Sequence, residues 1–340
     1  MTLRLEQAAL DDVPWDDLAA HPDATIAQTR AWLAFLQECH GAEPVAARVV
    51  VDGDETVGWY RGAQVRRFGV RILGSPLRGW STGAMGFTLG PAIDRVEAIA
   101  ALRAFAFGEL RCHHLEVADQ RTTPDQVGRT RLHPEELPGW ELDLRRSDDD
   151  LLAGMNQMAR RNIRKAARDG VQIEAVDPHD ADRFVADHAA LATEAFARRG
   201  RKPPFGPERV AALVRHLGPT GHLLLLRATD PGGTTISTGI FPGLPGAAAG
   251  FWTGATTRST DVPSSEALMW EAMQRWRALG AVRFDLGGGG PYKEKFGGEP
   301  VRLVRLHGSR IAALDTARRV VVEAERRRRL RRARRAIGAK

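Results

Sequence analysis

The sequence predicts a mixed α/β protein made of two similar modules and a C-terminal basic helix. Short runs rich in β-branched residues alternate with segments of helical periodicity. A helix followed by a strand occurs twice, at residues 96–118 and 265–286, each time after a set of strands, which indicates duplication of one α/β unit. The length of 340 residues also suits two domains better than one.

The first module is expected at residues 1–146. Residues 24–39 have helical spacing, with Trp32, Phe35 and Leu36 on one face and Gly41 as a stop. Residues 74–91 are rich in Gly, Ser and Pro and form a loop that could line a pocket, although a packed surface loop is the commoner outcome for such a stretch. The remaining predicted elements are strands at 45–51, 56–65 and 70–73, a helix at 96–110, and strands at 113–118 and 140–144.

The second module is expected at residues 147–311. Ser147 and Asp150 have the spacing of a capping box, which predicts a helix from Ser147 to about Arg168. Its second half carries a basic stripe that either binds phosphates or forms a solvated face, namely Arg161, Arg164, Lys165 and Arg168. Further strands are predicted at 171–176, 222–228, 234–241, 248–256, 282–286 and 301–307, and helices at 181–198, 207–217 and from a Ser264 cap to Gly280.

Residues 283–298, RFDLGGGGPYKEKFGG, are the stretch most indicative of a site. A strand carrying Asp285 enters four glycines, Gly287, Gly288, Gly289 and Gly290, whose backbone can approach a ligand closely. Lys293 and Lys295 add positive charge beside that loop. Because strands flank the glycines, the stretch is typical of a binding loop rather than of a linker.

Most of the net charge of +7 lies at the C-terminal end. Residues 318–340 carry a surplus of nine positive charges, which leaves residues 1–317 at −2. Such a segment either contacts RNA phosphates or anionic lipid headgroups, or is a solvated helix end. No apolar run is long enough to span a membrane and residues 1–14 lack a signal-peptide pattern, so we expect a cytoplasmic protein, with peripheral contact at the inner membrane face as an option.

No metal site or disulfide is expected. Cys39 and Cys112 are the only cysteines of the sequence, too few for a disulfide framework. His113 and His114 are adjacent on a predicted strand and therefore point to opposite faces.

The segments ARRNIRKAARDGVQIE and FDLGGGGPYKEKFGG together resemble the FemABX group and the BioF2-like acyltransferases of the GNAT superfamily. The resemblance covers residues 147–310 well and the first module only in its order of elements. It implies two tandem GNAT-like domains beside a substrate cleft, and residues 312–340 as a basic helix. The first part of this helix is then expected to pack on the first domain through an apolar stripe at Ala313, Leu314, Ala317, Val320, Val321 and Ala324.

The resemblance implies transfer of an acyl or aminoacyl group to an amine, with no tightly bound cofactor. In the peptidoglycan branch of the family the donor is aminoacyl-tRNA and the acceptor an amine of a cell-wall precursor. In other branches the donor is acyl-CoA, which suits cell-envelope, polysaccharide or secondary metabolism. This sequence lacks both the helical hairpin that some members use for tRNA and the R/Q-x-x-G-x-G/A loop of ordinary acetyl-CoA enzymes before Ser264.

Catalytic roles are carried over by motif to Asp285, Lys293 and Lys295. Lys293 or Lys295, with the glycine N–H groups, would stabilise the oxyanion or donor phosphates, and Asp285 either activates the amine or caps loop N–H groups. The expected substrate-binding residues are Arg161, Arg164, Arg168, Gly287 to Gly290, Tyr292, Phe296 and Gly297. The protein is expected to be a monomer. The alternative of another class is a non-catalytic RNA- or membrane-binding protein that acts through residues 318–340.

Overall fold

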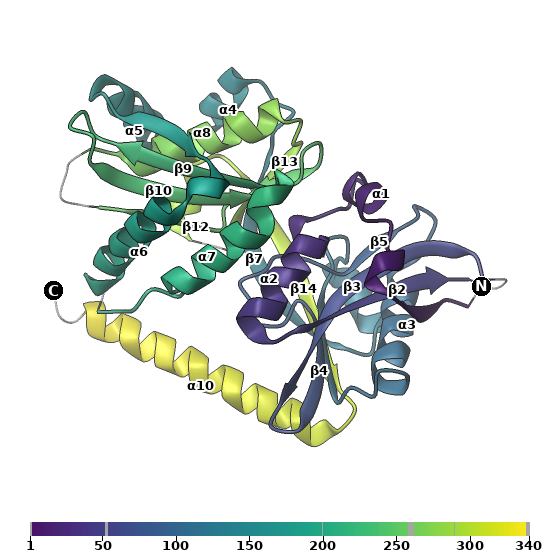
Figure 1. Ribbon diagram of the computed structural model, residues 1–340. Coiled ribbons are helices and arrows are strands. Elements are labelled where there is room, and N and C mark those ends of the chain that lie inside the picture. Colours follow the sequence, from purple (N-terminus) through teal and green to yellow (C-terminus); the bar gives the residue numbers. More distant parts are fainter. Residues whose placement is uncertain (1, 52–53, 199, 258–261, 289, 338–340) are drawn as a thin grey trace.

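Two α/β units share one long sheet in the computed structural model, which describes residues 2–51, 54–198, 200–257, 262–288 and 290–337 (Figure 1). The strand order of this sheet is β1-β2-β3-β4-β6-β14-β7-β13-β11, with β5 paired to β3. The strands are β1 (Arg4–Ala8), β2 (Glu43–Val50), β3 (Thr56–Arg67), β4 (Val70–Ser75), β5 (Phe87–Leu89), β6 (His114–Ala118), β7 (His133–Asp143), β11 (Ala248–Gly250), β13 (Arg283–Gly288) and β14 (Glu299–Ser309).

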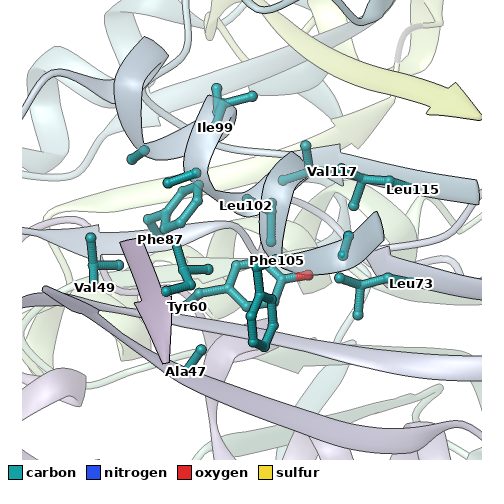
Figure 2. Close-up of a cluster of buried hydrophobic side chains, with 14 of the residues drawn as sticks. Ala47, Val49, Tyr60, Leu73, Phe87, Ile99, Leu102, Phe105, Leu115 and Val117 are labelled. Atoms are coloured by element: carbon teal, nitrogen blue, oxygen red, sulfur yellow. The ribbon is translucent and has the colours of Figure 1, made fainter. Parts of the chain in front are cut away.

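The first unit packs helices against the first part of this sheet. Its helices are α1 (Trp15–Ala19), α2 (Arg30–His40) and α3 (Arg95–Gly108). Figure 2 shows Ile99, Leu102 and Phe105 of α3 packed against strand residues such as Tyr60 and Phe87. All of these side chains are buried, so the predicted helix at 96–110 and its neighbouring strands form one hydrophobic core.

The second unit adds a four-stranded sheet of order β12-β10-β9-β8. Its strands are β8 (Gln172–Val176), β9 (Leu223–Thr229), β10 (Thr235–Pro242) and β12 (Thr253–Thr256), and its helices are α4 (Asp148–Gly154), α5 (Gln157–Arg168), α6 (Asp182–Ala197), α7 (Pro207–Leu217), α8 (Ser264–Ala278) and α9 (Pro291–Glu294). The strand predicted at 248–256 is in fact two. β11 pairs in parallel with β13, whereas β12 pairs with β10, so the chain leaves one sheet for the other at Phe251 and Trp252.

β14 joins the two units. It runs antiparallel between β6 and β7, with His307 opposite Glu116 on one side and His133 on the other. β7 in turn pairs with β13, where Glu141 lies opposite Asp285. A strand that follows the second unit therefore completes the sheet of the first, across the boundary predicted at residue 146.

The helix predicted from Ser147 to Arg168 is interrupted, which corrects the sequence analysis. Ser147 caps α4 as expected, since its Oγ accepts a hydrogen bond from the N–H of Asp150 at 3.1 Å. The helix ends at Gly154, and Asn156 caps a new helix, α5, by accepting from the N–H of Ala159 at 2.8 Å. Asn is a strong N-cap residue, and here it starts the second helix inside one apparently continuous helical pattern.

Ser264 does not cap α8 as predicted but is its first residue. Pro263 occupies the cap position without a side-chain hydrogen bond. The Oγ of Ser264 is buried and has no hydrogen-bond partner within the described part of the chain. Within the described residues, the N-cap position of α8 therefore provides no side-chain hydrogen bond to the first turn.

Helix α10 (Ala312–Ile337) leaves the first unit and extends along the lower edge of the molecule (Figure 1). Arg318 holds its first turns, bonding Glu116 through Nε at 2.7 Å and Glu135 through Nη2 at 3.0 Å. The apolar stripe does not pack as expected, because Ala313, Ala317 and Ala324 are exposed and Val320 is 65% exposed. Ion pairs rather than apolar contacts thus anchor the helix. No helix in the described ranges is long and apolar enough to cross a membrane.

Candidate active site

A cavity of about 850 Å³ lies between the two units. Residues Ser81 to Ala84 contribute one wall, which confirms that the loop at 74–91 lines a pocket. The other walls come from residues 25–27, 120–121, 137–141, 248–252 and 301–303 and from the motif residues Asp285, Gly287, Gly288 and Lys293. A cavity of this size is in the range of small-molecule sites.

Two carboxylates face each other in this cavity. Asp285 of β13 and Glu141 of β7 are direct cross-strand partners, so their side chains emerge on the same face of the sheet. Burial raises the pKa of Glu141, and the neighbouring Asp285 raises it further against the opposing effect of Arg283. Burial also raises the pKa of Asp285, against the opposing effects of the Gly287 N–H and of the charge of Lys293.

Asp285 is oriented by the loop that follows it. Its Oδ1 accepts a hydrogen bond from the N–H of Gly287 at 2.6 Å, next to a register shift in the pairing of β13 with β7. Its Oδ2 faces the loop of the first unit, since a Cβ added to Gly83 would lie 3.9 Å from it. One oxygen is thus held by the backbone while the other points across the cavity.

Gly287 is favoured by its backbone conformation and lies close to Lys293. Its φ of +77° lies in the left-handed region, and an added Cβ would lie 2.7 Å from Lys293 Nζ. Its N–H is used by Asp285 and is therefore not free for an oxyanion. Gly288 also lines the cavity, Gly290 lies at the start of α9, and Gly289 is outside the described residues.

Lys293 supplies the motif's positive charge to the cavity. Its Nζ lies 5.5 Å from the centroid of the Phe251 ring, within cation–π range. Burial lowers the pKa of Lys293, and the charge of Asp285 opposes this shift. The ammonium and the Asp285 carboxylate are therefore electrostatically coupled at the point where β11 and β12 diverge.

Lys295 is directed away from the cavity. Its Nζ donates to Oε1 of Glu266 on α8 at 2.5 Å and lies 3.9 Å from the centroid of the Tyr292 ring. Glu266 also accepts from Asn162 of α5 at 2.9 Å. Both members of the ion pair are largely buried, with exposed side-chain fractions of 12% and 7%, so the pair ties α9 to α8.

The last two motif residues also attach the loop to the second unit. Phe296 is fully buried. Gly297 has a φ of +76°, and an added Cβ would lie 2.3 Å from the carbonyl oxygen of Gly154, at the break between α4 and α5. The N–H of Asn156 donates to the carbonyl oxygen of Lys295 at 2.9 Å. The motif loop therefore packs against the α4–α5 break.

The arginine stripe does not reach the cavity. Arg161, Arg164 and Arg168 are exposed on α5, and none of them belongs to the cavity lining. Tyr292 is also exposed, and its hydroxyl donates to the carbonyl oxygen of Ser265 at 3.3 Å. These four residues lie on the outer surface of the second unit.

The cavity contains charged residues that the sequence analysis did not select. They are Glu141, Arg121, Arg283 and Arg302. Arg121 bonds Asp23 at 2.6 Å, and Arg283 Nη1 lies 3.6 Å from Glu141 Oε2. Arg283 is the first residue of the stretch at 283–298 and was open to selection. Glu141 comes to the site through strand pairing, which only the fold reveals.

Comparison with known proteins agrees with this architecture. Residues 153–295 match the family model described as an acetyltransferase (GNAT) domain. No curated protein matches the sequence significantly.

Solved structures share the fold at low sequence identity. The crystal structure of FemX has a TM-score of 0.73 and 14% identity, over 92% of this chain and 99% of that one. A tandem GNAT protein from the clavulanic acid biosynthesis pathway has a TM-score of 0.54 and 14% identity, over 90% and 98% of the two chains. The C-terminal domain of a protein described as a lysylphosphatidylglycerol synthetase from Agrobacterium fabrum has a TM-score of 0.52 and 13% identity, over 77% and 85%.

The predicted tandem GNAT architecture is therefore confirmed. A second unit with a GNAT domain and a chain-long match to FemX account for both halves of the fold. The second unit therefore contains a GNAT-type acyltransferase domain, within a chain that shares the fold of FemX across both units.

Proposed function

We propose that the protein transfers an acyl or aminoacyl group from an activated donor to an amine acceptor in the cavity between the units. The observation that carries this proposal is the arrangement of Asp285, Glu141 and Lys293 on the cavity surface. Two carboxylates of raised pKa and one ammonium of lowered pKa match the needs of aminolysis.

The acceptor amine would bind as an ammonium ion between Asp285 and Glu141. One carboxylate takes its proton, and the free amine attacks the carbonyl carbon of the donor. Lys293 stabilises the oxyanion that develops on the carbonyl oxygen. As the C–N bond forms, the nitrogen loses a second proton to the other carboxylate. The C–O or C–S bond then breaks, one of the two protons passes to the leaving oxygen or sulfur, and the other is released to solvent. A carboxylate of raised pKa is a suitable carrier, because it accepts a proton more readily than an ordinary carboxylate.

In this scheme the motif loop is held in place by Lys295, Phe296 and Gly297. They attach α9 to α8 and to the α4–α5 break, and α9 carries Lys293. We therefore assign Lys295 a positioning role in place of a direct catalytic one.

The donor is proposed to be an aminoacyl ester such as aminoacyl-tRNA, as in the peptidoglycan branch of the family, with a cell-wall precursor or related amine as acceptor. Two features support a large polyanionic donor. The exposed residues Arg161, Arg164 and Arg168 lie outside the cavity, where only a ligand that extends beyond it would meet them. The sequence before Ser264 also lacks the glycine-rich loop that ordinarily holds the CoA pyrophosphate, although residues 258–261 are outside the described part.

An acyl-CoA donor is the second candidate, and one structural feature favours it. β11 and β12 separate beside β13, and within the described residues the nearby N-cap position of α8 provides no side-chain hydrogen bond. Diverging strands leave backbone groups open to an extended ligand, and an uncapped helix N-terminus favours an anion.

The test is a transfer assay with charged tRNAs and acyl-CoA thioesters as donors and amine-bearing precursors as acceptors. Asp285→Asn and Lys293→Met are expected to lower kcat by about 10²–10³-fold, in the range of acid–base and oxyanion groups. Glu294→Gln, an exposed change on the same short helix, is the matched control and keeps wild-type turnover.

Normal turnover in both Asp285→Asn and Lys293→Met would overturn the proposed roles. Binding measurements distinguish the two candidate donors. Stabilisation by acyl-CoA but not by charged tRNA selects the second candidate. If tRNA is the donor, Arg164→Ala raises KM for tRNA and makes the dependence of KM on salt concentration shallower, because one phosphate contact is removed.

A further inference from the structure

A second cavity, of about 320 Å³, lies beside α1 and the start of α2. Its lining combines residues of the first unit with Thr220, His222 and Leu244 of the second. Thr25 lines this cavity as well as the central one, so a single segment separates the two. The acyl-transfer scheme uses none of the groups in this second cavity.

Arg61 of β3 lines this cavity and is almost completely buried, at 1% exposure. Its Nη2 donates to Thr88 Oγ1 at 2.5 Å, while Nε and Nη1 have no hydrogen-bond partner among the described residues. The ion pairs of the described part of the chain include none to Arg61. Burial alone lowers its pKa, to about 9, so the guanidinium remains charged at neutral pH.

A buried cation without a counter-charge is strongly unfavourable, and proteins normally pair it. Two other largely buried arginines follow that rule. Arg95 bonds Asp119 at 2.8 Å, and Arg318 bonds Glu116 at 2.7 Å. Arg61 has no such carboxylate partner among the described residues, and it lines a cavity.

We propose that this cavity binds a small ligand through an oxyanion group, a carboxylate or a phosphate, that pairs with Arg61. A guanidinium with two free donors is suited to such a group. His222 offers a further buried ring nitrogen, Nδ1, that has no partner in the described part of the chain. Asp16, the acidic residue of the lining, is exposed.

The rest of the lining indicates the body of the ligand. Trp15, Leu18 and Leu244 give the cavity an apolar side. The volume is at the lower end of the range of small-molecule sites and has room for about ten heavy atoms, which suits a small carboxylic acid or a small phosphoester.

Binding would also reach the central cavity. The segment between the two cavities is held by Thr25 Oγ1, which donates to the carbonyl oxygen of Ala84 at 2.9 Å, and by Gln28 Nε2, which donates to that of Met85 at 2.6 Å. Ala84 itself lines the acyl-transfer cavity. A ligand at Arg61 would therefore stabilise a wall that the two cavities share.

The experiment measures the melting temperature of the full chain in a buffer of bulky organic ions, with phosphate, acetate or propionate added. Wild-type protein is expected to gain about 2–4 °C with the matching anion. Arg61→Met removes this gain and, without anion, melts above the wild type, because it removes an unpaired buried charge. Arg66→Met, an exposed change on the same strand, keeps the wild-type response.

A second variant fills the space and leaves Arg61 in place. Ala19→Leu, on the cavity lining, is expected to lose the anion response while keeping the charge. Stabilisation by acetate or propionate identifies a carboxylate ligand, and stabilisation by phosphate alone identifies a phosphoester.

Phosphate also stabilises proteins nonspecifically, and this effect is expected to persist in Arg61→Met. The shift in melting temperature of Arg61→Met is therefore subtracted from that of the wild type. The proposal is overturned if Arg61→Met melts below the wild type without anion, or if it keeps the full anion response. Neither result bears on the transfer assay, so this inference and the proposed function fail independently.

Discussion

The contact between Gly297 and Gly154 makes a quantitative prediction about the motif loop. In Gly297→Ala, the new Cβ would lie 2.3 Å from the Gly154 carbonyl oxygen and 2.5 Å from its carbonyl carbon, both backbone atoms that cannot rotate away. The left-handed φ of +76° adds about 1–2 kcal/mol, and the overpacking adds about 1–3 kcal/mol. We expect the variant to lose about 2–5 kcal/mol of unfolding free energy in urea denaturation.

Gly221→Ala is the matched control for this prediction. Gly221 has a φ of +71°, but a Cβ there would meet nothing within 4 Å. The control therefore carries the backbone strain without the overlap and is expected to lose only about 1–2 kcal/mol. Equal losses of unfolding free energy in the two variants would refute close packing of the motif loop against Gly154. In Gly297→Ala the transfer rate is also expected to fall, because the displaced loop carries Lys293.

Three further variants probe charges at and around the site. Lys295→Met leaves the buried Glu266 unpaired and should lower the unfolding free energy at pH 7 by about 3–5 kcal/mol. The pKa of Glu266 is lowered in the wild type, because hydrogen bonds led by Lys295 outweigh the effect of burial, so the difference in urea midpoints should narrow as pH falls below about 4.5. Asp285→Asn should raise the melting temperature, increasingly so above pH 4, because burial raises the pKa of Asp285 and its charged form destabilises the fold; an unchanged melting temperature at pH 8 would contradict this. Arg318→Met should lower the melting temperature by several degrees, whereas the exposed Arg319→Met should not, and equal scans for the two would show that ion pairs do not anchor α10.

Local signals predicted most of the elements and the motif that approaches the cavity. The β-branched runs, the Ser147 cap and the Asp285-to-Lys293 stretch are each encoded within a few neighbouring residues. The break at Asn156 was missed because helical periodicity continues on both sides of it. That break depends on a contact with Lys295, which is distant in sequence.

The different roles of the two motif lysines could not be predicted from the sequence. Lys293 and Lys295 are two residues apart on a short helical turn, so their side chains point in different directions. Only the position of Glu266 on α8 decides which one is buried in an ion pair. The role of Glu141 likewise depends on pairing between β7 and β13, a non-local contact that no local pattern reveals.

The position of β14 between β6 and β7 has a consequence for how the protein is made. The first unit lacks an interior strand of its sheet until Ser309 has left the ribosome, although its own hydrophobic core is synthesised nearly two hundred residues earlier. During that interval the facing edges of β6 and β7 expose unpaired backbone groups, which is the condition that favours aggregation and chaperone binding. The two units are therefore expected to complete folding together, and a fragment that ends at residue 146 is expected to remain partly unfolded.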